Sequence, residues 1–143
     1  MKIKLGEIKS RHQALCMVGN KNLPVKLAYA IGKNIIKLQE ETENIEKTRI
    51  KLVQHYAEKD ENGEFIIKDE RYDVGKNGEL LNKEFAELLD TETEVSIHTI
   101  TEDVLELLEN ERYDVLSPAE MIAIDFMIEN PQGTVTEETE PKA

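Results

Sequence analysis

Tryptophan is absent from this sequence, and cysteine and the other aromatic residues are few. The 143 residues include three Phe, four Tyr and one Cys. Leu, Ile and Val must therefore supply most of the core. The single cysteine, Cys16, cannot form a disulfide within the chain, which fits a reducing compartment. The length favours one domain.

Long apolar runs are also missing. No stretch approaches the ~18 apolar residues that a membrane-spanning helix needs. The first residues, Met1-Lys2-Ile3-Lys4-Leu5, are not followed by the apolar segment of a signal peptide. We therefore expect no membrane partner and no secretion through a signal peptide.

Charge is distributed unevenly along the chain. The formal net charge is −12, yet residues 1–37 carry eight Lys and Arg against one Glu. Residues 79–140 carry eighteen Asp and Glu against only Lys83 and Arg112. A net acidic chain repels nucleic acid and anionic membranes, whereas fields of this size steer association with oppositely charged surfaces. We expect protein partners and no direct contact with nucleic acid.

The strongest periodic pattern predicts one long helix over residues 24–57. At 1.5 Å per residue it spans roughly 50 Å, so it either projects or has an antiparallel partner. Thr42 and Arg49 interrupt its seam, and we expect these interaction residues to set packing register. Gly32 predicts close packing by another element. The seam has spacings of three and four and consists of Ala28, Ile31, Ile35, Leu38, Thr42, Ile45, Arg49, Leu52 and Tyr56.

Shorter elements are predicted around this helix. Thr101 and the Ser117-Pro118-Ala119-Glu120 capping sequence indicate helix starts. Helices are expected over residues 6–18, 80–89, 102–110 and 118–129, and strands over residues 2–5, 65–67, 72–74 and 94–100. The first strand is expected to pair with residues 95–100. The predicted fold is α+β, dominated by a long helical hairpin with a small antiparallel sheet. It forms a single helix-rich domain of residues 1–129, followed by a disordered acidic tail of residues 130–143.

The last helix is apolar nearly all round, which predicts burial or an interface. We expect it to dock on the hairpin or on a second copy through Met121, Ile124, Phe126 and Met127. The predicted core consists of Ile31, Ile35, Leu38, Ile45, Leu52, Phe85, Leu88, Val95, Ile97, Leu105, Ile122, Phe126 and Met127.

A five-residue segment occurs twice. Glu-Arg-Tyr-Asp-Val stands at residues 70–74 and again at residues 111–115. The same offset aligns Glu79 with Glu120 and Phe85 with Phe126. A duplicated loop-plus-helix unit explains this pattern. Coincidence in a chain rich in Glu and Asp explains it equally well.

No polar cluster has the spacing of a catalytic, metal or cofactor site. His12 and Cys16 lie one helical turn apart and make half a metal site at best. Residues 60–64 resemble the start of a calcium loop but lack its spacing. Ser117 is explained by its capping role, and the glycines form no phosphate loop. We expect a non-enzymatic protein with no cofactor.

Several motifs follow one another in a distinctive order. They are Met1–Leu5, Leu23–Tyr29 at the start of the long helix, His55–Gly63 at its end, and Leu116–Glu120 before the last helix. This order resembles small accessory proteins of tailed bacteriophages and prophages of Gram-positive and related anaerobic bacteria. The resemblance covers about residues 1–129, although residues 64–78 depart from it. It implies a phage setting, in the host cytoplasm or the virion. That family has no assigned activity, so no functional residue is carried over.

Three functional hypotheses follow. The first is a tail-cassette or assembly protein that works through protein–protein contacts as a homo-oligomer. The second is an acidic inhibitor that mimics nucleic acid on a host defence protein. The third is an oligomeric sponge that holds a small anionic signal with the N-terminal lysines.

Overall fold

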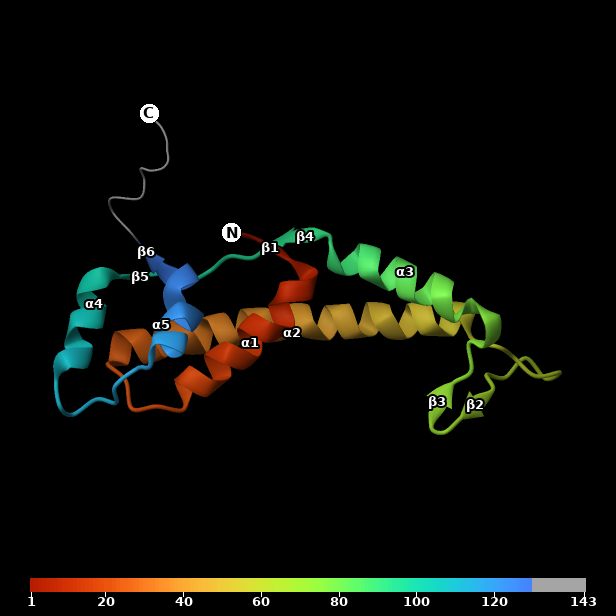
Figure 1. Ribbon diagram of the computed structural model, residues 1–143, viewed down its shortest axis with the longest axis horizontal. Coiled ribbons are helices and arrows are strands. Elements are labelled where there is room, and N and C mark those ends of the chain that lie inside the picture. The colour runs from red at the N-terminus through yellow and green to blue at the C-terminus, as the bar shows by residue number, and fades with distance from the viewer. Residues whose placement is uncertain (130–143) are drawn as a thin grey trace, which may run out of the picture.

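A single long helix, α2 (Val25–Tyr56), runs through most of the length of the molecule. In this computed structural model, which describes residues 1–129, α1 (Leu5–Gly19) crosses the N-terminal half of α2 (Figure 1). Helix α3 (Gly78–Leu89) runs back along its C-terminal half. The predicted helix-dominated α+β fold with a long helical hairpin is confirmed. The predicted tail of residues 130–143 lies outside the described residues.

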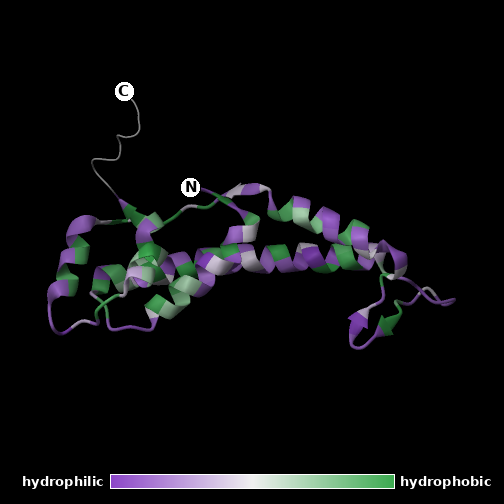
Figure 2. Cartoon of the chain, viewed as in Figure 1, coloured by the Kyte–Doolittle hydropathy of each residue, from purple (hydrophilic) through white to green (hydrophobic). Residues whose placement is uncertain are grey.

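The α1–α2 pair is held by apolar side chains that meet between the two helices. The inner face of α1 buries Ile8, Leu15 and Val18, and the facing side of α2 includes Leu27 and Ile31. Colouring by hydropathy shows hydrophobic and hydrophilic residues interspersed along α2 and α3 (Figure 2). A Cβ added to Gly19, at the end of α1, would lie 3.3 Å from Ile31, so the glycine lets the turn approach α2 closely.

Three two-stranded sheets occur within residues 1–129. Strand β1 (Lys2–Lys4) pairs antiparallel with β4 (Glu92–Glu94), with Ile3 opposite Thr93. Strand β2 (Ile67–Lys68) pairs with β3 (Arg71–Tyr72). Strand β5 (Ile100–Thr101) pairs in parallel with β6 (Ile128–Glu129).

The strand predicted over residues 94–100 is largely wrong. The partner of β1 ends at Glu94, and residues 95–99 form a crossing segment that lies outside every sheet. Side chains of α2 bond to its backbone instead: Lys37 donates to the carbonyl of Ser96, and Asn34 bonds to His98. These contacts take backbone groups that a neighbouring strand would otherwise pair with.

The remaining helices are short. A 3₁₀ turn (Gly75–Asn77) leads into α3, and α4 (Glu102–Glu106) continues as a second 3₁₀ turn (Leu107–Glu109). Helix α5 (Pro118–Ile124) and a third turn (Asp125–Met127) replace the helix predicted to reach residue 129. Thr101 stands before α4, but its side chain caps no amide. Its hydrogen bond to Asp103 lowers the pKa of that carboxyl group instead.

The buried core differs from the predicted one. Ile122 is 75% exposed, because it lies on the outer face of a short helix whose inner face carries Ile124. Four predicted residues are buried, namely Ile31, Leu38, Val95 and Met127. Eight are half-buried: Ile35, Ile45, Leu52, Phe85, Leu88, Ile97, Leu105 and Phe126. The prediction missed ten buried residues, namely Ile3, Ile8, Leu15, Val18, Leu23, Leu27, Ala30, Ile100, Val104 and Ile124.

Gly32 has no close neighbour, contrary to the prediction. A Cβ at this position would meet nothing within 4 Å outside the local backbone of its own helix. The close approach occurs at Gly6, where an added Cβ would lie 3.2 Å from the carbonyl oxygen of Leu89. Gly32 therefore costs helix stability without gaining any contact within the chain.

We predict that Gly32→Ala raises the free energy of unfolding by about 1 kcal/mol, because Ala has the higher helix propensity and fits the open space. Gly6→Ala is the matched comparison and should lower it, because its new methyl group meets the Leu89 backbone. Urea unfolding at low protein concentration measures both changes. A loss of stability in Gly32→Ala would contradict the open space assigned to the Gly32 position.

Asn34 is the one fully buried polar residue among those described. Its side-chain nitrogen donates to the His98 carbonyl at 2.9 Å, and its side-chain oxygen accepts from the His98 amide at 2.7 Å. The same nitrogen lies 3.5 Å from the sulfur of Met127. One side chain thus pairs both backbone groups of His98, as a neighbouring strand would.

We predict that Asn34→Ala lowers the free energy of unfolding by roughly 2–3 kcal/mol, because it leaves the amide and carbonyl of His98 without hydrogen-bond partners. Asn44→Ala, at an exposed position of the same helix, should change it by less than about 0.5 kcal/mol. Equal effects in chemical denaturation would rule out a special role for the buried amide.

Candidate functional site

The two copies of the repeated segment lie at opposite ends of α2. In the first copy, Tyr72 accepts a hydrogen bond from Gln54 near the C-terminus of α2. In the second, Asp114 bonds to Asn22 just before α2 begins, through backbone and side chain at 2.9 and 2.7 Å. Their conformations differ, since β3 forms in the first copy alone. The first copy holds a loop against the end of α2 and the second holds one against the turn before it, but they do not form a repeated fold unit.

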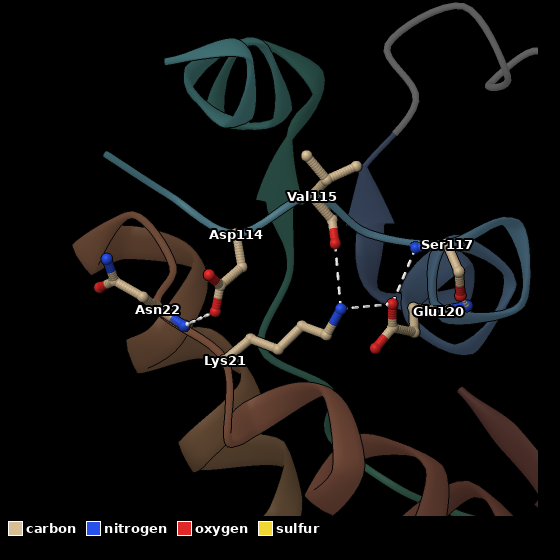
Figure 3. A network of polar contacts seen from close by, with 6 residues as sticks. All are labelled: Lys21, Asn22, Asp114, Val115, Ser117 and Glu120. Carbon is tan, nitrogen blue, oxygen red and sulfur yellow. Dashed lines mark hydrogen bonds and ion pairs between the residues drawn. The ribbon is translucent and has the colours of Figure 1, made fainter. Parts of the chain in front are cut away.

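A polar network beside the second copy fixes α5 (Figure 3). Lys21, in the turn between α1 and α2, donates to the Val115 carbonyl at 3.0 Å and to Glu120 at 2.8 Å. Glu120 also accepts from the Ser117 amide at 2.8 Å, while the Ser117 hydroxyl accepts from the Glu120 amide at 3.2 Å. This completes the predicted capping box and ties the start of α5 to the other helices.

The network also stabilises the charged form of Glu120. The hydrogen bond from Lys21, followed by the one from the Ser117 amide, lowers the pKa of this carboxyl group below its ordinary value. Both donors favour the carboxylate over the neutral acid. The position of α5 therefore depends in part on the ionisation of one residue.

An open groove lies between α4 and α5. Its volume is about 480 Å³, and its charged lining residues are all acidic. Ile122 projects from α5 and is mostly exposed, and Met121 is partly exposed beside it. The lining includes Glu102, Leu105, Glu106, Met121, Ile122 and Asp125. The groove combines an apolar floor with carboxylates, which suits an apolar side chain flanked by cations.

Thr42 and Arg49, predicted to set register, bond within their own helix. The Thr42 hydroxyl donates to the Leu38 carbonyl at 2.9 Å, and Arg49 makes two bonds to Glu46 at 2.6 and 2.9 Å. The Arg49 contact lowers the pKa of Glu46. Both predicted residues line a second groove of about 590 Å³, together with Leu5, Lys9, Ile45, Phe85 and Leu89.

The four residues predicted on the last helix divide between core and surface. Ile124 and Met127 are fully buried, and we assign them to the core. Phe126 is half-buried beneath the guanidinium group of Arg11, 4.9 Å from its ring centre. Of these four residues, only Met121 lines the α4–α5 groove. Its neighbour in the groove is Ile122, which was predicted to lie in the core. The docking of α5 against α1 within the chain accounts for this division.

Within residues 1–129, no group of three or more His, Cys, Asp or Glu side chains is placed to hold a metal ion. His12 lies 3.8 Å from the sulfur of Cys16 as a pair. No helix in this part of the chain is both long and apolar enough to span a membrane. No family model, curated protein or solved structure matches the chain.

We predict that Glu120→Gln makes the free energy of unfolding less dependent on acid pH. The folded-state pKa of Glu120 is lowered, so its stabilisation is present above the unfolded value of 4.5 and is lost as pH falls through the folded value. The native chain should therefore lose more stability than the variant between pH 6 and pH 3.

Other carboxylates add a common acid effect, so Glu61→Gln, in an exposed turn, is the control. It should follow the native curve, as measured by urea unfolding at each pH. If Glu120→Gln follows the same curve, the network does not hold the charged form of Glu120.

Proposed function

We propose that this chain is a non-enzymatic phage accessory protein that acts through protein–protein contacts, as a tail-cassette or assembly component. The observation that carries the proposal is the α4–α5 groove, where a 75% exposed Ile122 stands among carboxylates. Its partner is a protein segment that presents an apolar side chain beside Lys or Arg. The phage setting rests on the resemblance of the sequence motifs given above.

The groove has the properties of a docking site because its walls are held firmly. Covering Ile122 removes an apolar side chain from water, worth roughly 1.5–3 kcal/mol when burial is complete. Glu102, Glu106 and Asp125 favour a cationic partner and speed its approach. The Lys21–Glu120 contact fixes α5 before the partner arrives, which lowers the entropy cost of binding.

A second candidate is the acidic inhibitor of a host defence protein. It is favoured by the exposed carboxylates of α4 and the turn that follows it, which are Glu102, Asp103, Glu106 and Glu109. A short row of negative charges resembles a phosphate backbone to a basic nucleic-acid-binding surface. The anion sponge has less support, because Lys4, Lys21 and Lys37 already bond to Asp90, Glu120 and the Ser96 carbonyl.

We predict that a photo-crosslinking amino acid placed at Ile122 captures a basic phage structural protein in cells that express the full phage cassette. The same amino acid at Ile67, which is 62% exposed on β2, is the matched control and should capture none. Raising the salt concentration before irradiation should lower the yield of cross-linked product, because the carboxylates contribute to docking. Mass spectrometry of the cross-linked band identifies the protein.

The identity of the captured protein separates the two candidates. A structural or tail protein supports the assembly role, whereas a host nucleic-acid-binding protein supports inhibition. Labelling from neither position, or equal labelling from both, contradicts docking at the groove. Ile122→Asp should abolish capture at a probe placed at Met121, since it puts a further charge on the groove floor.

A further inference from the structure

One face of α2 is apolar and largely exposed, although the crossing segment and α4 border it beside Val25 and Tyr29. Val25, Tyr29, Gly32 and Ile36 follow spacings of four, three and four, which place them on one side of the helix. We call these four residues the free face. Val25 is 80% exposed, and Tyr29 and Ile36 are each 57% exposed. The opposite side of the same helix segment is the one that packs into the core, through Leu27, Ile31, Asn34 and Leu38.

The shape of the free face suits another helix. Gly32 forms a notch, because a Cβ there would meet nothing within 4 Å. The large side chains on either side of it stand up as ridges. Tyr29 is held in place, with its ring 5.4 Å from the His98 ring and 5.8 Å from the ammonium of Lys33. A notch between fixed ridges is the surface into which a partner helix can pack.

The charges along α2 identify the occupant. Up to residue 39, the charged residues of α2 are all basic, namely Lys26, Lys33 and Lys37. Residues 40–46 then carry Glu40, Glu41, Glu43 and Glu46. An antiparallel copy of the helix sets basic against acidic twice, through the two-fold axis, whereas a parallel copy opposes like charges. The face is thus complementary to itself.

We propose that the free face binds a second copy of this chain, forming an antiparallel two-fold dimer. The axis passes midway between Gly32 and Ile36, so Ile36 of each copy fills the notch at Gly32 of the other. Tyr29 then lies opposite Gln39. Lys26 of one copy lies within one turn of Glu40 and Glu43 of the other. This surface is separate from the α4–α5 groove, so the dimer does not depend on the partner proposed above.

Sedimentation equilibrium of the full chain, over about a hundredfold range of concentration, tests the dimer. The native chain should dimerise, and Ile36→Asp should weaken the dimer by at least about tenfold because it puts a charge into an apolar contact. Gly32→Leu should also weaken it, because it fills the notch. Ile67→Asp, at a comparably exposed position on β2, is the control and should leave it unchanged.

A charge exchange tests the antiparallel register. Lys26→Glu alone, and Glu40→Lys with Glu43→Lys, should each weaken the dimer. The three changes together should restore it, which a defect in folding of the single chain cannot do. Far-UV circular dichroism of every variant confirms that the helices remain. Both the native and the restored dimer should weaken with added salt.

A chain that stays monomeric across the whole range overturns the inference. A dimer that Ile36→Asp leaves intact and Ile122→Asp abolishes also overturns it, because self-association would then use the α4–α5 groove. Failure of the triple variant to dimerise rejects the antiparallel arrangement. Capture of a partner at Ile122 by the Ile36→Asp chain is scored separately, so the proposed function can stand or fall without the dimer.

Discussion

The contact between Asn34 and His98 determines how α2 is joined to the crossing segment that leads to α4 and α5. A buried amide side chain pairs both backbone groups of a segment that belongs to no sheet. Such a segment would otherwise leave polar groups unpaired beside the core, at a cost of roughly 1–3 kcal/mol each. The same amide contacts Met127, so the turn after α5 is placed by the same residue. Three stretches far apart in sequence therefore meet at one side chain.

This arrangement explains which side of α2 remains uncovered. The crossing segment lies along α2 at Asn34 and Lys37, while α1 packs against the side that carries Ile31. With β5 and α4, which border Val25 and Tyr29, these neighbours cover only part of the N-terminal half of α2. Among the described residues, Val25, Tyr29 and Ile36 remain more than half exposed on its outer side. The free face is thus a consequence of how the core is closed.

Much of the helical framework could be predicted from the sequence. Periodicity located α2 within one residue at each end, and the capping box at Ser117 formed as expected, because both depend on local chemistry.

The strand predicted over residues 94–100 failed because its alternation resembles that of a paired strand. Buried Asn34 shares the helical spacing of Leu27, Ile31 and Leu38, whereas exposed Asn44 does not, but the predicted seam passed beside Asn34 and did not include it. The α4–α5 groove was also missed, because Ile122 follows the apolar pattern of its helix but faces outward. Tertiary contacts decided each of these positions.

The charge polarity of the chain has two consequences that the sequence alone does not separate. Part of it is neutralised within the fold: Lys4 meets Asp90, Lys21 meets Glu120, and the N-terminal amine meets Glu94. The first contact raises the pKa of Lys4, and the last lowers that of Glu94, so both join β1 and its neighbours as charged pairs. What remains for partners is the charge beside exposed apolar residues, along α2 and around Ile122. Charge alone gives weak and unspecific attraction, whereas charge beside an apolar contact sets both orientation and affinity. In the function and the dimer proposed above, recognition therefore depends on those two surfaces, and the net charge is a poor guide to partners.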